Sequence, residues 1–168
     1  MFVPFESLPS TARVWIFQST RPFTDDEAGQ ITARLKSFTD EWNVHGMPLK
    51  TSFLIEHRQF IILAADEREQ TASGCSIDSS VRILKELEQS LGLTLFDRDL
   101  VAFKPAEDIL MIPLANLKEN FANGTLDADM LTFYNLVNTK GQLESEWLVP
   151  SKNTWLKRYI PKPLAKVQ

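Results

Sequence analysis

The residues with the greatest chemical potential in this sequence lie in one stretch, residues 60–81. An apolar run, residues 60–65, ends at Asp66 and Glu67, and a polar loop then leads to Cys75, the only cysteine of the chain. Carboxylates can act as general acid or base, and a thiol at the start of a helix can act as a nucleophile because the helix favours its thiolate. We therefore look first for a functional site here.

A helix is expected directly after this loop and must position the thiol. Ser76 is a suitable N-cap, and Asp78 would stabilise the first turn through the helix dipole. The apolar residues that follow recur at helical spacing, and Gly92 is a natural stop. They are Ile77, Val81, Leu84, Leu87 and Leu91. Gly74 predicts a special backbone conformation or a close approach.

Several polar segments are expected to meet at one end of the sheet. They are the loop with His45 and Gly46, the carboxylates after residue 65, residues 73–76, and the lead-in before Arg13. The amides of residues 76–79 would favour an anion, since they start a helix. We predict a small anionic ligand there. The ligand-binding residues would be Arg13, Asp66, Ser73, Gly74, Ser76 and Asp78. No metal site is predicted, because no His or Cys spacing is typical of one.

The order of predicted elements gives the fold class. A strand at residues 13–19 is followed by a helix with a capping box, Thr24 to Glu27, and an apolar stripe. The stripe comprises Ala28, Ile31, Leu35, Phe38 and Trp42. Strands at 49–56 and 60–65 joined by His57–Arg58, the second helix and a strand at 100–103 follow. Strand, helix, strand, strand, helix, strand predicts a ferredoxin-like α+β unit at 1–104, an antiparallel sheet with both helices on one face.

The remaining residues, 105–168, are predicted to pack on this unit as a C-terminal α/β extension, giving one structural domain. The first and third strands are apolar on both faces, so something must cover the second face of the sheet. The extension, or a second copy of the protein in a homodimer, would do so. The extension contains an apolar segment at 109–113 and a short amphipathic helix with Leu117 and Phe121, ending near Gly124.

Composition narrows the function classes. With 168 residues, 43% of them hydrophobic and 24% charged, the chain is typical of a globular protein. No apolar run approaches the roughly 18 residues of a membrane span, no secretory signal is expected, and the single cysteine fits a reducing compartment. We predict a cytoplasmic protein without a membrane partner. The residues identify no cofactor.

The charge of the chain argues against nucleic acid as a partner. The net charge is −4, and phosphate-backbone binding needs a positive field. Residues 151–168 carry five cations and no acid, which we interpret as a solvated tail. Trp15, Phe17 and Phe60 could stack RNA bases on a ferredoxin-like sheet, but the third strand ends in acids rather than in a basic–aromatic pattern. RNA binding is therefore only a distant third hypothesis.

Several motifs together resemble a known family. They are residues 13–18, 42–49, 66–67 with 72–80, 96–98, and 135–140 with 146–150. This combination is similar, over nearly the whole chain, to short bacterial proteins of about this length whose activity is not established. Members are sometimes labelled ABC transporter ATPases. That label does not fit here because the chain has no G-x-x-x-x-G-K-[ST] motif. The resemblance implies no activity.

Two functional hypotheses follow. The first is a cytoplasmic binding or interaction module that holds a small anion, or a protein partner, beside the second helix. The second is a cysteine-dependent enzyme or redox sensor, with Cys75 as nucleophile, His45 or Glu67 as base, and the amides of Ser76 and Ile77 as oxyanion donors. We favour the first, because the sequence contains no recognised catalytic constellation.

Overall fold

The computed structural model describes residues 1–163. The chain divides into a first unit, Met1–Asp97 with Val137–Ser145, and a second unit, Arg98–Leu136 with Glu146–Gln168. This division differs from the single boundary predicted after residue 104. Both units combine helices with antiparallel sheets, so the α+β class is confirmed. None of the helices within residues 1–163 has the length and apolarity that crossing a membrane requires.

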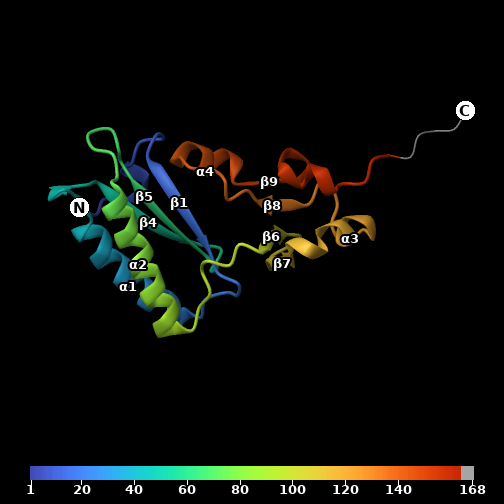
Figure 1. The fold of residues 1–168 in the computed structure, drawn as a ribbon, viewed down its shortest axis with the longest axis horizontal. Helices are drawn as coiled ribbons and strands as arrows, with labels where there is room; N and C mark the ends of the chain where they lie inside the picture. The colour runs from blue at the N-terminus through green and yellow to red at the C-terminus, as the bar shows by residue number, and fades with distance from the viewer. Residues whose placement is uncertain (164–168) are drawn as a thin grey trace, which may run out of the picture. The chain divides into compact units, whose positions relative to one another are not determined.

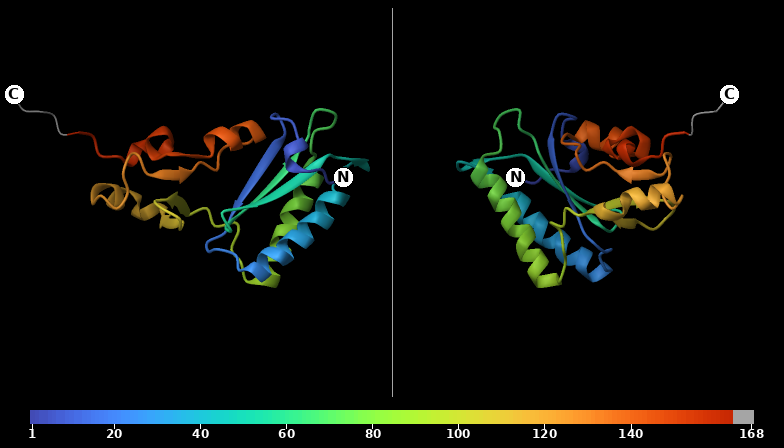
Figure 2. Two further views of the ribbon diagram at one scale, coloured as in Figure 1. Left: turned by 180° about the vertical axis from the view of Figure 1, so that it is seen from behind. Right: turned by 45° about the vertical axis from the view of Figure 1, so that its right-hand side comes forward.

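The first unit contains a three-stranded sheet with two long helices on one face (Figure 1). Its strands are β1 (Arg13–Gln18), β4 (Thr51–Glu56) and β5 (Phe60–Ala65), and their order β1-β5-β4 is antiparallel throughout. The helices α1 (Asp25–Glu41) and α2 (Gly74–Leu91) run side by side over the sheet in both views of Figure 2. The strand–helix–strand–strand–helix order predicted for this part is present.

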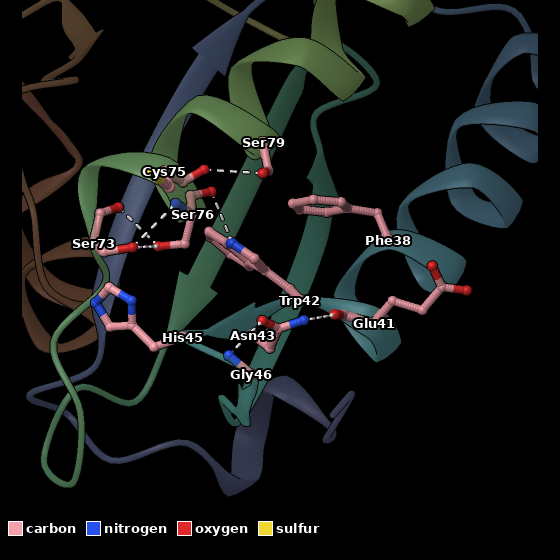
Figure 3. A pocket seen from close by; sticks show the side chains of 10 residues that line it. All are labelled: Phe38, Glu41, Trp42, Asn43, His45, Gly46, Ser73, Cys75, Ser76 and Ser79. Carbon is pink, nitrogen blue, oxygen red and sulfur yellow. Dashed lines mark hydrogen bonds between the residues drawn. The ribbon is translucent and has the colours of Figure 1, made fainter.

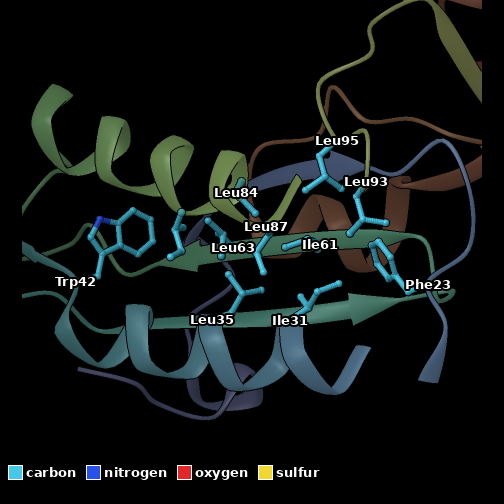
Figure 4. Packing of buried hydrophobic residues seen from close by; sticks show 11 residues of the cluster. Phe23, Ile31, Leu35, Trp42, Ile61, Leu63, Leu84, Leu87, Leu93 and Leu95 are labelled. Atoms are coloured by element: carbon cyan, nitrogen blue, oxygen red, sulfur yellow. The ribbon is translucent and has the colours of Figure 1, made fainter. Parts of the chain in front are cut away.

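The core of this unit lies between the sheet and the two helices (Figure 4). The predicted stripe of α1 supplies Ile31 and Leu35, both fully buried, and α2 supplies Leu84. Burial of one such side chain contributes about 1.5–3 kcal/mol. Trp15 and Phe17 point to the same side of the sheet and pack against this cluster. These two aromatics therefore belong to the core rather than to a base-stacking surface.

The hairpin between β4 and β5 has a connection of three residues, 57–59, rather than the predicted two, because Glu56 pairs with Phe60. Glu56 O accepts from Gln59 N at 3.1 Å, and both His57 (φ 50°) and Arg58 (φ 55°) have left-handed backbone conformations. Side chains disfavour this conformation. The turn is held by bonds to another segment, including Phe23 N to Arg58 O at 2.6 Å.

The predicted fourth strand belongs to the second unit instead, so the ferredoxin-like sheet is not confirmed. β6 (Leu100–Lys104) pairs with β7 (Leu110–Pro113) and β8 (Leu131–Phe133), and β9 (Leu148–Pro150) completes the sheet β7-β6-β8-β9. A strand pattern in the sequence identifies a segment that will join a sheet, but it does not identify the strand that lies next to it. Here β6 pairs with the strand that follows it along the chain, for which loop closure costs little entropy.

The second unit has its own small core. The predicted short amphipathic helix is present as α3 (Leu117–Ala122), which buries Leu117 and Phe121 against Phe103. The chain after α3 turns at Gly124, where φ is 82°. Short 3₁₀ helices complete this unit: η2 (Leu114–Asn116), η3 (Ser151–Asn153) and η4 (Trp155–Tyr159). Lys166, part of the predicted basic tail, lies outside the described residues.

The second face of the first sheet is also apolar and buried. Phe60, Ile62 and Ala64 point to this face and have no exposed area. Within the first unit, η1 (Phe5–Ser7) packs against β4, and residues 137–145, which include most of α4 (Lys140–Glu146), join the edge of β1. That residues 105–168 as a whole cover this face stays a prediction. Phe60 is buried and offers no surface for stacking.

Candidate functional site

A cavity of about 410 Å³ lies between the end of α1 and the start of α2 (Figure 3). Because β1 and β5 are antiparallel, the helices that follow them also run in opposite directions, and the end of one meets the beginning of the other. The cavity is lined by Phe38, Glu41, Trp42, Asn43, His45, Gly46, Ser73, Cys75, Ser76 and Ser79. The cavity therefore contains several of the predicted site residues, and it also contains the end of α1, which was not part of the prediction.

The start of α2 lies three residues earlier than predicted. Ser73, not Ser76, is the N-cap: its Oγ accepts from Ser76 N at 3.3 Å. Ser76 Oγ in turn donates to Ser73 O at 2.8 Å. Both serines suit a cap, and the earlier start adds helical hydrogen bonds while it retains a serine cap. Asp78 consequently lies beyond the first turn, is exposed, and does not line the cavity.

The shifted start changes which amides are available. Ser76 N and Ile77 N, the predicted oxyanion donors, already donate to Ser73 Oγ and Ser73 O. The free amides are instead those of Gly74 and Cys75, for which the residues described provide no acceptor. Gly74 shows neither a left-handed backbone nor a close approach, because a Cβ built on it would meet no atom within 4 Å. The prediction of a special backbone conformation or a close approach at this glycine is therefore wrong.

Trp42 forms the rigid centre of the cavity wall. It is only 3% exposed, and its Nε1–H donates to Ser76 O at 2.9 Å, which ties the end of α1 to the first turn of α2. Its ring packs against Phe38, with centroids 5.0 Å apart, and against Trp15 on β1, at 5.6 Å. Such contacts hold the wall in one arrangement before any ligand binds.

His45 reaches the cavity from a tight hairpin. β2 (Asn43–Val44) and β3 (Met47–Pro48) are joined by His45 and Gly46, with φ of 51° and 78°, and Gly46 N donates to Asn43 Oδ1 at 3.2 Å. The imidazole lies near Ser73 at one end of the cavity (Figure 3). Cys75 is exposed and lines the same cavity. Within the part of the chain described, no hydrogen bond joins the Cys75 thiol to His45.

Glu67 and Arg13 lie outside the cavity, contrary to their predicted roles. Glu67 Oε1 accepts from Ala72 N at 2.7 Å and pairs with Arg13 Nη1 at 3.8 Å. The Arg13 guanidinium also lies over the Trp15 ring, 4.7 Å from its centroid. These contacts fix the loop before α2. The structure does not bring Glu67 to Cys75 as a base.

Asp66 belongs to a different pocket. Its carboxylate is buried and accepts three side-chain bonds from Arg68, from Nε to Oδ1 at 3.0 Å, from Nε to Oδ2 at 3.2 Å and from Nη2 to Oδ2 at 2.8 Å. This guanidinium holds the pKa of Asp66 below its ordinary value. Asp66 lines a second cavity of about 400 Å³ with Met47 and Lys50, among others. The predicted ligand set is thus split between two places.

Six lining residues were absent from the predicted catalytic and ligand-binding residues. They are Phe38, Glu41, Trp42, Asn43, Gly46 and Ser79. Phe38 and Trp42 read as core positions in the sequence, and both do pack against the core. The predicted topology could have found them, since it makes the two helices antiparallel and brings the end of the first beside the start of the second.

No three His, Cys, Asp or Glu residues within 1–163 form a group that could hold a metal ion. No protein-family model, curated protein or solved structure matches this chain. The resemblance to short bacterial proteins therefore stays a prediction from the motifs. What the fold and site define is an α+β protein with a ligand-sized cavity between two helix ends.

Proposed function

We propose that the protein is a binding module whose cavity holds a small ligand by an anionic group at the start of α2. The observation that carries the proposal is the position of the Gly74 and Cys75 amides, which have no acceptor among the described residues, at a cavity of about 410 Å³. Small-molecule pockets commonly measure 300–1,000 Å³. The cavity is therefore large enough for a compact ligand.

Electrostatics at this end of the cavity favour negative charge. The N-terminus of a helix carries roughly half a positive elementary charge. The first turn of α2 contains no acid that would neutralise it. The N-cap bond of Ser73 and the Trp42–Ser76 bond fix the first turn, so an anion would meet donors that are already oriented.

Two substitutions at the N-cap test the proposal with hexanoate as the probe. Asn and Asp both cap helices well, so Ser73→Asn and Ser73→Asp should unfold within about 0.5 kcal/mol of each other. Only Asp adds a charge beside the free amides. We expect Ser73→Asn to bind hexanoate within about twofold of the wild type and Ser73→Asp to bind roughly tenfold more weakly.

Amide NMR titrations give both the affinity and the place of binding. The Gly74 and Cys75 resonances should shift most. Equal affinity of the two variants, or shifts confined to another region, would contradict the proposal. Protection of Cys75 from iodoacetamide by bound hexanoate provides a second readout, because the exposed thiol lines the same cavity.

The second candidate is a cysteine-dependent enzyme or redox sensor. It is favoured by one observation, the exposed Cys75 and His45 lining a common cavity. Against it, Glu67 lies elsewhere and the Ser76 and Ile77 amides are occupied. The rate of Cys75 alkylation as a function of pH, in folded and unfolded protein, separates the two. An activated thiol would react faster when the protein is folded, whereas a binding module should also retain hexanoate affinity in Cys75→Ala.

The thiol also bears on the cellular setting of the protein. An exposed free thiol fits a reducing compartment, so we place the protein in the cytoplasm. We also propose that it belongs to the bacterial group that its motifs resemble, and that its first unit is related to ferredoxin-like folds through three strands and two helices. A protein partner or a second copy in a homodimer stays an alternative occupant of its surface. RNA binding gains no support from the buried sheet aromatics.

A further inference from the structure

The cations near the end of the chain are carried by folded structure. Residues 151–160 form η3 and η4 within the second unit, which contradicts the solvated tail expected from the sequence for this part. Leu156 is only 1% exposed in the core of the unit, and Thr154 caps η4 by accepting from Leu156 N at 3.2 Å. Figure 1 draws this part as the red coil that follows β9. The exposed side chains of η4 are therefore held on an ordered backbone.

The positive charge of this segment is not neutralised locally. Three exposed cations form no ion pair with any residue that the structure describes: Lys157, Arg158 and Lys162. Lys152 differs, because it pairs with Asp129 at 2.7 Å. Salt largely screens exposed charges that lie more than about 10 Å apart. An anionic partner at this surface would therefore respond to the local cations more than to the net charge of −4 of the whole chain.

Two aromatic side chains lie among these cations. Trp155 and Tyr159 are partly buried against the core of the second unit, and their rings meet edge to face with centroids 6.1 Å apart. The guanidinium carbon of Arg158 lies 5.9 Å from the centroid of the Trp155 ring. A 3₁₀ helix places residues three apart on the same side, so Trp155 and Arg158 share one side of η4. The surface combines positive charge with aromatic rings in a defined arrangement.

The aromatic rings distinguish among the anionic partners that this charge could attract. Binding to a bilayer needs apolar side chains that can insert, but Leu156 is buried and the two rings pack against the core. An acidic peptide needs only the cations. Single-stranded nucleic acid uses both features, because its phosphates bind cations while its bases stack on aromatic rings and guanidinium planes.

We propose that residues 155–162 form a binding surface for single-stranded nucleic acid. Lys157 and Lys162 bind phosphate groups, and one base stacks on the exposed part of the Trp155–Arg158 pair. This surface lies in the second unit, whereas the residues that line the cavity beside α2 lie in the first. The inference therefore stands or falls independently of the proposed cavity ligand.

Two probes of equal charge test this assignment on the full chain. One is a labelled oligouridylate of about twelve nucleotides, and the other is an abasic ribose-phosphate oligomer of the same length. Their binding is followed by fluorescence anisotropy at about 50 mM salt. We expect oligouridylate to bind roughly fivefold more tightly, since a partly buried ring offers only part of the usual stacking surface. The logarithm of its binding constant should fall against the logarithm of salt concentration with a slope of about −2, as for three phosphate contacts.

Substitutions separate the charge from the ring. Lys157→Gln should weaken oligouridylate binding roughly fivefold and make the salt slope shallower by about 0.7. Lys36→Gln is the matched control, because it removes the same charge from an exposed lysine of the first unit and should leave the affinity unchanged. Trp155→Leu keeps an apolar side chain against the core but should abolish the preference for oligouridylate over the abasic oligomer. Trp155→Phe retains a ring and should preserve that preference.

Each other outcome would overturn the proposal. Equal binding of the two oligomers by the wild type, or tighter binding of an oligoglutamate of the same charge, would indicate an acidic peptide as the partner. Cosedimentation with phosphatidylserine vesicles in the absence of oligouridylate binding would indicate a membrane surface. An affinity that Lys157→Gln leaves unchanged would place the nucleic acid elsewhere on the protein. The comparison of the two oligomers uses the wild type alone, so it is decisive even where a variant fails to fold.

Discussion

The N-termini of the two long helices differ in how their amides are satisfied. At α1, Thr24 Oγ1 accepts from Glu27 N at 3.1 Å, and Glu27 Oε2 accepts from Thr24 N at 3.2 Å, forming a capping box. The first turn of α1 contains three acids, Asp25, Asp26 and Glu27. At α2, Ser73 caps one amide and the first turn contains no acid.

The difference shows which helix end uses its partial positive charge for stability and which could use it to bind an anion. The positive end of α1 is neutralised by its own side chains, and Arg21 in turn pairs with Glu27 through two bonds of 2.9 Å. The positive end of α2 has no acid in its first turn and lies at a cavity. Two helices of similar length, each with a hydroxyl side chain at its N-cap, can therefore have different roles.

The largest expected effect comes from Trp42, which holds the start of α2 in place. Trp42→Ala removes a buried aromatic and the donor to Ser76 O, so it should lower the free energy of unfolding by about 3–5 kcal/mol in urea titrations. Leu35→Ala is the control, because this residue is equally buried in the same core but does not line the cavity. Its cost should be about 2–5 kcal/mol.

Trp42→Phe refines this test. It keeps most of the aromatic volume but leaves Ser76 O without its partner, which costs about 1–3 kcal/mol. We expect the hexanoate-induced shifts of Gly74 and Cys75 to become smaller in this variant, and those shifts to persist in Leu35→Ala. A loss below about 0.5 kcal/mol for Trp42→Ala would show that this residue does not anchor α2.

The two caps should be equal for stability and unequal for binding. Thr24→Ala and Ser73→Ala each remove one N-cap bond and should each cost about 1 kcal/mol in urea titrations. Only Ser73→Ala should weaken hexanoate binding, because only that cap orients the free amides at the cavity. Weaker binding in Thr24→Ala to the same degree would mean that global stability, rather than the start of α2, controls affinity.

A charge exchange sharpens the comparison further. Cys75→Asp gives the first turn of α2 an acid, as α1 has, and should raise the free energy of unfolding by about 0.3–1 kcal/mol through the helix dipole. It should at the same time weaken hexanoate binding by repulsion. Cys75→Asn is the neutral control and should change neither property by this mechanism. If Cys75→Asp raised both stability and hexanoate affinity, or lowered both, the helix dipole could not explain the two effects.

Most features that depend on residues close together in the sequence were predicted correctly, whereas several features that depend on distant residues were not. The capping box at Thr24 and Glu27 is a local pattern, and the structure contains it. The predicted start of α2 is wrong by one turn, because Ser73 and Ser76 are both suitable N-cap residues. The choice between them also involves the bond from Trp42, a residue distant in sequence, to Ser76 O. β6 was assigned to the wrong sheet because a strand pattern leaves the choice among partners open.

The candidate site was predicted in part for the same reason. His45, Ser73 and Cys75 meet in one cavity, as chain order indicated. Glu67 was drawn away by a short-range bond to Ala72 N, and Asp66 by its pairing with Arg68. The order of elements along the chain therefore predicted where the cavity lies. Side-chain pairing in the loop before α2 keeps both carboxylates, Glu67 and Asp66, out of that cavity.

The smallest expected effect is a difference in acid sensitivity between the two helix ends. The hydrogen bond from Arg21 is the main cause that lowers the pKa of Glu27, and the bond from Thr24 N adds to it. The folded state then binds fewer protons than the unfolded state near this pKa. The contribution of Glu27 is therefore present above the unfolded pKa of about 4.3 and is lost as pH falls through the folded value.

In hydrogen-exchange measurements between about pH 6 and 3, after correction for intrinsic rates, protection at the start of α1 should fall further than at the start of α2, whose first turn has no acid. Glu27→Gln should remove most of the difference. An equal acid response at both helices in the wild type would show that the α1 capping box is not the source of its stability.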